Sequence, residues 1–452
     1  MKKTLCSFLV LWCLVISCTN ENYFDTSREE VQSTNNSIQF SSFKMSKQVA
    51  QNILLSFIEN QSPSLTRGGN SVEIEDVECL NYVMNTSVTT RASVKSDTVT
   101  VYKFKIKSNE SEGYGLVPGD IRTPKVLAYC PKGDLNDTVY NKGLAMIMRN
   151  IPNVLQKSID EFEKAKSSLG FIQTRAFNFF GDNVDVNQDD INIITDITHR
   201  WLGDTLCIDT TSVSFWKQEL RDYRVPVRWG QGAPYNNKVP YVCGNSKAPA
   251  GCVAVAIAQI MAYWKYPSSY NWSILTSSPT ISAYSLEDEQ RRSEVSKLIA
   301  DIGSKVHMQY GCNGSGSNIV YANEALQNYG YNTSYYSDFS YDQLTNYIVK
   351  NGPTYIRGID SQTGEGHAWV ADALYAATGL VTFNHHCYLN GKDVHSDVFA
   401  FPLSWFDYCR FVHLNWGWDG YSNGWFEYQL SNDDSKNTYK NDMKVIFNIK
   451  PR

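Results

Sequence analysis

Four side chains in the C-terminal half of this 452-residue chain are of the types needed for acyl transfer by a thiol. Cys252 opens an apolar, alanine-rich run that reads as a helix ending near Pro267. Unpaired N–H groups and the positive end of the helix dipole favour an anion at a first turn, so the sequence predicts a lowered thiol pKa. Gln231 lies upstream, and His367 and Asn415 follow downstream.

Each residue type answers one requirement of that reaction. The thiolate attacks a carbonyl, an imidazole holds and then returns a proton, and a third group fixes the imidazole tautomer. Donors must also stabilise the oxyanion, and losing one typically costs about 3–4 kcal/mol of barrier stabilisation. We expect Cys252 as nucleophile and His367 as base and acid. Asn415 is expected to orient His367, Trp416 to shield that contact from water, and the Gln231 amide to bind the oxyanion.

The elements that must position these groups form an α+β pattern. A helix is predicted from Cys252, and a strand across Gly366-His367-Ala368-Trp369-Val370-Ala371-Asp372. Asp372 lies five residues after His367, so on a strand it faces the opposite way and is expected to be structural. The N-terminal third predicts a helix over 46–58, strands between 99 and 129, and helices over 145–169. Residues 182–192 are polar and read as an exposed connection.

The N-terminus has the form of an export signal. Lys2-Lys3 precedes an apolar stretch, Leu5 to Ile16, that is too short to span a bilayer. It ends in Val15-Ile16-Ser17-Cys18, which resembles a bacterial lipobox with Cys18 as the lipidated residue. An ordinary signal peptide that is cut nearby is the alternative. Either form predicts that the protein leaves the cytoplasm.

Composition and net charge limit the classes of partner that this chain is expected to bind. The net charge of −5 and the lack of a basic block give no reason to expect nucleic acid, and membrane contact is expected only through the lipid anchor. Of eleven cysteines, Cys6 and Cys13 leave with the signal and Cys18 carries lipid. If Cys252 is free, seven remain and cannot all pair with one another, so no disulfide framework is inferred.

Several blocks, in order, resemble the streptopain family of papain-like cysteine peptidases. The match runs from about Val225 to Arg452. Its blocks are Gln231-Gly232-Ala233-Pro234-Tyr235-Asn236, the segment Gly251 to Met261, Gly366 to Asp372, and Leu414-Asn415-Trp416-Gly417-Trp418-Asp419-Gly420.

The resemblance implies a papain-like α+β fold, in which a mainly helical half presents the cysteine and an antiparallel β half presents the histidine. It also implies a zymogen whose N-terminal α+β propeptide is an intramolecular inhibitor, no cofactor, and protein or peptide substrates. The expected boundaries are a signal peptide over 1–17, a polar tether over 18–45, a propeptide over 46–170, an activation linker over 171–215 and a catalytic domain over 216–452.

Substrate contacts are expected from the family arrangement at four further residues, Ser315, Gly316, Ser317 and Gly366. One departure from the family pattern is an insertion over roughly 379–410, so substrate preference does not carry over. The insertion contains His385, His386, Cys387, His395 and Cys409. Their spacing matches no closed zinc site, and we expect no metal.

The sequence thus predicts an exported, surface-anchored or secreted cysteine endopeptidase that uses a Cys252–His367 thiolate–imidazolium pair. As an anchored lipoprotein it would reside in the periplasm or at the outer membrane or cell surface, and its mature domain could be released. Two alternatives stay open: a protease-like acyltransferase or transglutaminase, and a non-catalytic surface adhesin.

Overall fold

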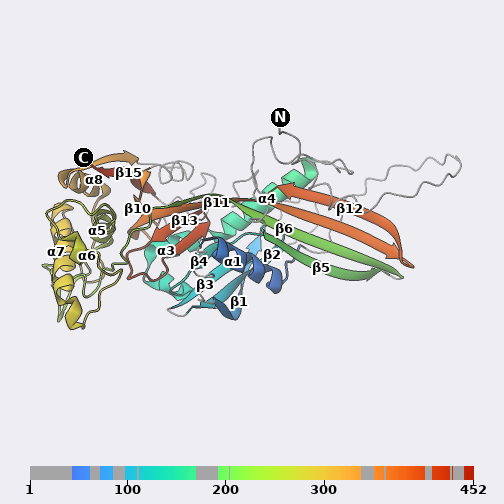
Figure 1. The fold of residues 1–452 in the computed structure, drawn as a ribbon, viewed down its shortest axis with the longest axis horizontal. Coiled ribbons are helices and arrows are strands. Elements are labelled where there is room, and N and C mark those ends of the chain that lie inside the picture. Colours follow the sequence, from blue (N-terminus) through green and yellow to red (C-terminus); the bar gives the residue numbers. More distant parts are fainter. Residues whose placement is uncertain are drawn as a thin grey trace, which may run out of the picture. The chain divides into compact units, whose positions relative to one another are not determined.

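The computed structural model describes residues 43–61, 72–84, 97–108, 111–168, 192–202, 204–336, 351–360, 363–402, 410–427, 430 and 442–452 (Figure 1). Its longer helices are α1 (Lys47–Gln61), α3 (Lys142–Met148), α4 (Ile151–Ser168), α5 (Cys252–Trp264), α7 (Glu289–Lys305) and α8 (Ile319–Asn328). None of the described helices has the length and apolar character needed to cross a membrane. The signal segment and Cys18 lie outside the described residues.

The helical half of the C-terminal region is built around α5. Nearly every side chain of this helix is buried, because the apolar run leaves no polar face for water. Helices α6 (Trp272–Leu275), α7 and α8 pack with it into one hydrophobic core. The helix ends at Lys265, which adopts a left-handed conformation, and Pro267 follows shortly after.

The β half is an antiparallel sheet that continues into the N-terminal block. Its main path runs β1-β2-β3-β4-β14-β13-β11-β10-β15-β9. The N-terminal strands are β1 (Glu73–Met84), β2 (Asp97–Lys107), β3 (Glu112–Pro118) and β4 (Ala128–Cys130). The C-terminal strands on this path are β9 (Tyr331–Tyr336), β10 (Thr354–Ile359), β11 (Gly366–Leu389), β13 (Arg410–Asn415), β14 (Gly424–Glu427) and β15 (Lys444–Pro451). The predicted α+β arrangement, with a helical half and an antiparallel β half, is confirmed.

The junction between the two blocks is the pairing of β4 with β14. Tyr129 lies opposite Trp425, and Ala128 lies opposite Phe426. The backbone N–H of Glu427 donates to the carbonyl of Leu127 at 2.8 Å. Residues some 300 positions apart therefore share one strand ladder, and β14 is an interior strand only while the N-terminal block is in place.

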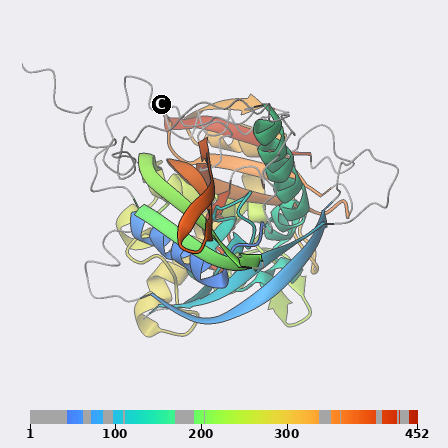
Figure 2. The same ribbon diagram turned by 90° about the vertical axis from the view of Figure 1, so that its right-hand side faces the viewer.

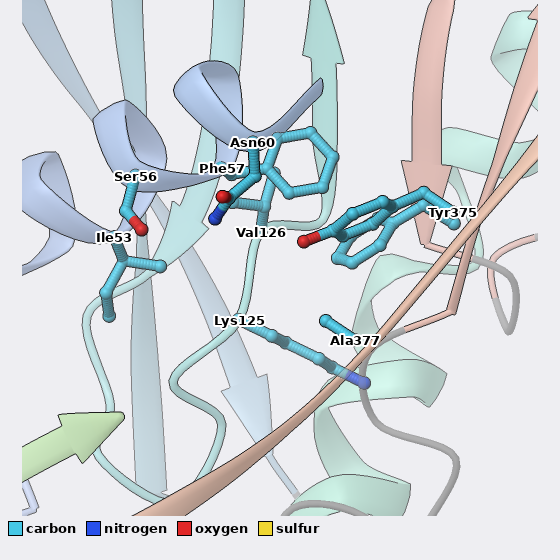
Figure 3. Close-up of a pocket in the computed structure, with 9 residues that line it drawn as sticks. Ile53, Ser56, Phe57, Asn60, Lys125, Val126, Tyr375 and Ala377 are labelled. Atoms are coloured by element: carbon cyan, nitrogen blue, oxygen red, sulfur yellow. The ribbon is translucent and has the colours of Figure 1, made fainter. Parts of the chain in front are cut away.

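A buried ion pair crosses the same junction. Lys125 Nζ lies 3.1 Å from Glu427 Oε1, and the side chains are 1% and 0% exposed. Beside it is a small cavity of about 20 Å³, at which the Phe57 ring of α1 packs edge-to-face against Tyr375 of β11 (Figure 3). The cavity is lined by Ile53, Ser56, Phe57, Asn60, Lys125, Val126, Tyr375, Ala377 and Phe411. An ion pair this deep is stable only with both partners present.

Strands β5 (Asn192–Leu202) and β6 (Thr205–Asp222) require a correction to the predicted linker. Residues 192–215 are not a connection: they form β5 and most of β6, and β6 pairs with β11 along nearly its whole length. In the view of Figure 2, this pair (green) lies beside α1 (blue), which β5 contacts. Residues 171–191 lie outside the described residues, and the activation boundary itself stays a prediction.

Two disulfides overturn the expectation of no disulfide framework. Cys207 of β6 is bonded to Cys387 of β11, and Cys243 is bonded to Cys312. The count of seven leftover cysteines excluded complete pairing but not partial pairing. Cys387 belongs to the insertion, whose described part extends β11 and forms β12 (Lys392–Pro402). Among the described cysteines, Cys79, Cys130 and Cys252 are free.

We predict that Lys125→Ala lowers the free energy of unfolding by about 3–5 kcal/mol, because it removes the cation that offsets the buried charge of the Glu427 carboxylate. The joint replacement Lys125→Met with Glu427→Leu should restore most of that loss, since it removes both charges and keeps the volume. Denaturant unfolding in a Cys252→Ala background, which excludes self-cleavage, measures both. A Lys125→Ala variant as stable as its parent contradicts the role of this pair.

Candidate active site

Gly251 allows Cys252 to sit at the first position of α5. Its φ of +92° is a conformation that favours glycine, and it caps the helix without a side chain. A Cβ at this position would lie 2.6 Å from both Sδ and Cε of Met308 and 3.3 Å from the Ser315 carbonyl oxygen. Any other residue here would disturb both the backbone turn and the packing beside the thiol.

The Cys252 thiol is buried, with 9% of the residue exposed. Burial raises its pKa above the ordinary value. The backbone N–H groups of Ala368, Val253 and Cys252 itself act in the opposite direction, as does the charge of Arg357. The helix start therefore lowers the pKa of the thiol as predicted, but desolvation of the thiolate raises that pKa by more in this state.

The His367 imidazole is held in an aromatic pocket. Its Nε2–H donates to the backbone carbonyl of Trp416 at 2.9 Å. The ring lies nearly parallel to those of Trp369 and Trp418, with centroids 6.1 Å away in each case. The residue is only 4% exposed, and burial lowers its pKa to about 4, so the ring is neutral at physiological pH.

Cys252 and His367 are not joined by a hydrogen bond in the described structure, although both lie next to β11. Alternate residues of this strand face opposite ways. Ala368, which donates to the thiol, packs in the core of the helical half. Trp369, which lies against the imidazole, packs in the core shared with the N-terminal block. Cys252 and His367 thus both lie at β11, but they do not form a catalytic pair in this state.

Helix α3 of the N-terminal block presses on the imidazole. A Cβ added to Gly143 would lie 2.7 Å from His367 Cδ2 and 2.7 Å from Trp416 Cζ3. The Asn141 side chain fixes the start of this helix by accepting from the Leu144 N–H at 3.0 Å. The backbone of α3 therefore lies against the histidine at a distance that only glycine permits.

Asn415 does not bond His367 in this state, and its expected role of orienting the imidazole stays a prediction. Its Nδ2 donates to the Val227 carbonyl at 3.1 Å, and its Oδ1 accepts from Gln259 Nε2 at 3.0 Å and from the Gly417 N–H. The group that holds the imidazole is the Trp416 carbonyl. Asn415 instead ties β13 to α5. Trp416 lies beside the ring, with centroids 6.3 Å apart, and its expected shielding role stays a prediction.

Gln259 is the residue that the sequence reasoning missed. It is 0% exposed in the middle of α5, and its Nε2 also donates to the Trp229 carbonyl at 3.2 Å. A glutamine inside an otherwise apolar helix was a usable signal, because a buried amide needs hydrogen-bond partners. Through Trp229 it fixes the segment that leads to Gln231.

Gln231 lies close to the nucleophile along the backbone. It is 7% exposed, and its carbonyl accepts from the Ala250 N–H at 2.8 Å, two residues before Cys252. The loop that follows is anchored by Tyr235, whose hydroxyl donates to Asp419 Oδ1 at 2.6 Å. The structure thus brings Gln231 and Cys252 into one unit.

The predicted substrate residues separate into two places. The loop with Ser315, Gly316 and Ser317 lies against the turn at Gly251 and is fixed by a two-way bridge between Gly316 and Gln309. Gly366 begins β11 opposite Ile359. Away from these groups, Asp372 bonds His413 Nδ1 at 2.6 Å and accepts the Val225 N–H, as its opposite facing on the strand predicted.

Comparison with known proteins places the central part of this site in a described family. Residues 229–426 match the sequence model of the peptidase C10 family. The chain is 27% identical over 266 residues to the thiol protease/hemagglutinin PrtT of Porphyromonas gingivalis, which covers 50% of this chain and 26% of that protein. It is 22% identical over 386 residues to streptopain of Streptococcus pyogenes, which covers 75% of this chain and 76% of streptopain.

Two solved structures from Prevotella intermedia are also similar. A prointerpain A fragment has a TM-score of 0.44 and 16% identity, covering 82% of this chain and 100% of its own. Active interpain A, a cysteine protease, has a TM-score of 0.36 and 20% identity, covering 51% of this chain and 97% of its own.

The depressed His367 pKa predicts a specific pH dependence of stability. The unfolded chain takes up a proton near the ordinary value of 6.5, whereas the folded ring takes it up only near 4. Stabilisation from the neutral buried ring is therefore complete above about pH 6.5 and is lost as the pH falls toward 4, by about 2–3 kcal/mol at pH 4.5.

Denaturant unfolding of Cys252→Ala and of Cys252→Ala/His367→Gln at pH 7 and pH 4.5 tests this. The first protein should lose more stability between the two pH values, by that amount. Equal losses in the two proteins would show that the ring is not held neutral in this pocket.

Proposed function

Because the chain belongs to the streptopain family of papain-like cysteine peptidases, we propose that it is a cysteine endopeptidase made as an inactive precursor. The observation that carries this proposal is the arrangement at β11: Cys252 begins a helix on one side, and His367 is held on the other by the Trp416 carbonyl and the backbone of Gly143. In this proposal Cys252 and His367 are the catalytic groups, and the N-terminal block holds His367 away from the thiol.

The imidazole is already in the tautomer that the reaction needs. Since Nε2–H donates to the Trp416 carbonyl, the lone pair is on Nδ1. Once α3 leaves, a ring that turns toward Cys252 presents Nδ1 to the thiol. The proton then passes from sulfur to Nδ1, and the resulting imidazolium stabilises the thiolate that burial alone disfavours.

Peptide hydrolysis then follows in two steps. The Cys252 thiolate attacks the peptide carbonyl carbon, while the backbone N–H of Cys252 and the Gln231 amide bind the oxyanion. His367 gives its proton to the leaving amine, and an acyl-thioester remains. A water molecule, deprotonated by His367, attacks the thioester and releases the acid and the free thiol.

Residues 46–170 act in this proposal as the intramolecular inhibitor. Three contacts support the role: the β4–β14 ladder, the buried Lys125–Glu427 pair, and α3 against His367. Together they couple the fold of the N-terminal block to the position of one catalytic ring. Removal of the block frees the ring and exposes the thiol.

We propose that the activating cut falls before β5. Strand β6 is paired to β11, and Cys207 is bonded to Cys387, so a cut between 208 and 215 would leave the inhibitor covalently attached. Export by a signal peptide over 1–17, with lipid on Cys18, places the precursor at the cell surface or in the periplasm, and the cut releases the mature domain from its tether.

Self-processing is the first test. The precursor starting after Cys18 should shorten under mild reducing conditions, whereas its Cys252→Ala twin should not, and mass spectrometry of the product should find a peptide that still links Cys207 to Cys387. A mature N-terminus beyond Cys207 would contradict the proposed cut. Equal shortening of both proteins would contradict self-cleavage by Cys252.

Gly143→Ala tests the displacement of the histidine. The added methyl group overlaps two buried rings, so α3 must move away from His367, and we expect self-processing to accelerate at least severalfold. Lys142→Ala is the matched control, because it removes only the surface pair with Glu365, worth up to about 1 kcal/mol. Time courses of precursor loss compare the two, and a Gly143→Ala rate no higher than that of Lys142→Ala contradicts the mechanism.

A further inference from the structure

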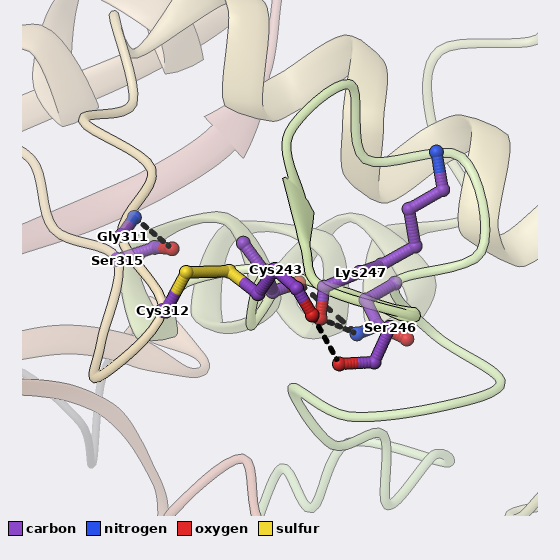
Figure 4. The surroundings of a disulfide bond; sticks show 8 residues. Cys243, Ser246, Lys247, Gly311, Cys312 and Ser315 are labelled. Carbon is purple, nitrogen blue, oxygen red and sulfur yellow. Dashed lines mark hydrogen bonds between the residues drawn. A yellow bond between two sulfur atoms is a disulfide. The ribbon is translucent and has the colours of Figure 1, made fainter.

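The disulfide between Cys243 and Cys312 joins two segments that flank the nucleophile (Figure 4). Cys243 belongs to a short hairpin of β7 (Val242–Cys243) and β8 (Ser246–Lys247), just before Gly251. Cys312 belongs to the loop over 311–317, sixty-nine residues later in the sequence. The bond therefore links the segment that leads into α5 to a loop that contacts the turn at the start of that helix.

The 311–317 loop touches the turn that presents the thiol. The Ser315 carbonyl lies 3.3 Å from the position that a Cβ would take on Gly251. Three of the seven loop residues, Gly311, Gly314 and Gly316, are glycine. Such a segment has much conformational freedom to lose, so its position depends strongly on its anchors.

The non-covalent anchors of this loop are few. Gln309 and Gly316 exchange two backbone hydrogen bonds, the Gly311 N–H donates to Ser315 Oγ, and Ser317 Oγ donates to the Val306 carbonyl. The loop residues between these points, including Cys312 itself, are exposed. The disulfide is the anchor that fixes the outer part.

The other end of the disulfide is attached to the Gln231 segment. Asn236 Nδ2 donates to the Lys247 and Ala248 carbonyls at 3.3 and 3.0 Å. The Ala250 N–H then donates to the Gln231 carbonyl at 2.8 Å. A continuous set of bonds thus runs from the 311–317 loop through Cys312 and the hairpin to the oxyanion donor and the thiol.

We propose that Cys243–Cys312 is a positioning bond, which holds the 311–317 loop at a fixed distance from Cys252 so that the loop binds the extended substrate backbone ahead of the scissile bond. This inference rests on the proposed peptidase function. The bond touches no reacting atom, so its loss weakens substrate binding rather than the chemical step. KM rises and kcat is nearly unchanged when the bond is removed.

The chain offers a matched control. Cys207–Cys387 joins β6 to β11, and both of its cysteines are buried. Removing either disulfide lowers the stability of the folded chain, because each closes a long loop. A purely structural role for Cys243–Cys312 predicts the same KM after removal of either disulfide. A positioning role predicts that only removal of Cys243–Cys312 raises KM.

The test measures hydrolysis of a fluorogenic peptide by the activated enzyme, by Cys243→Ser/Cys312→Ser and by Cys207→Ser/Cys387→Ser, with active sites counted by a peptidyl epoxide. We expect the first double variant to raise KM by about tenfold or more with kcat within about twofold, and the second to leave KM unchanged. Equal KM values for the two variants overturn the inference. A wild-type enzyme that hydrolyses no peptide overturns the proposed function and this inference with it.

A second measurement tests the inference if the Cys243→Ser/Cys312→Ser variant does not fold. Cys312 is exposed whereas Cys207 and Cys387 are buried, so a graded reductant breaks Cys243–Cys312 first in the folded wild-type enzyme. Mass spectrometry of the alkylated cysteines follows the opening of this bond. KM should rise as the bond opens and should fall again on reoxidation. A KM that stays constant through opening of the bond overturns the inference.

Discussion

The position of one imidazole ring connects the parts of this structure. His367 donates from Nε2 to the Trp416 carbonyl, and that hydrogen bond sets the tautomer, while burial among tryptophans lowers the pKa of the ring and keeps it neutral. The same bond leaves Nδ1 with its lone pair. The N-terminal block contacts the same ring through the backbone at Gly143, so the imidazole is held between Trp416 and α3.

The strength of that confinement comes from the sheet rather than from α3. Helix α3 is only seven residues long and would not hold a ring by itself. It is placed by a block whose strands continue the catalytic sheet through β4 and β14, and whose Lys125 forms a buried ion pair with Glu427. Because backbone pairing and a buried ion pair must break together, small fluctuations of α3 do not release the histidine. In the proposed mechanism, proteolytic loss of the block is what releases the ring.

Much of this could be predicted from the sequence, for physical reasons. An apolar run opened by Gly251-Cys252 can only be a buried helix with its thiol at the first turn, and the alternation around His367 can only be a strand. The order of Gln231, Cys252 and His367 along the chain predicted which side chains form the active site. Their present separation was not predictable, because it depends on the packing of Gly143, more than two hundred positions away in sequence.

Other features were missed for the same reason. The sign of the Cys252 pKa shift depends on burial, which outweighs the helix start and which no local pattern reveals. The partners of the Asn415 amide on α5 and at Val227 were not predicted either, and its role toward His367 in the active enzyme stays a prediction. Partial disulfide pairing, and the pairing of β6 with both β5 and β11, are long-range contacts that a cysteine count and a polar stretch could not reveal.

The central claim is that the N-terminal block keeps Cys252 and His367 apart and that its removal pairs them. The most direct measurement is the pH dependence of Cys252 alkylation by iodoacetamide, followed by mass spectrometry, before and after removal of the block. The account predicts that the thiol in the precursor reacts only as the pH rises above its ordinary pKa, and that the mature thiol reacts rapidly on a plateau through neutral pH that His367→Ala abolishes. Identical profiles before and after removal would contradict it.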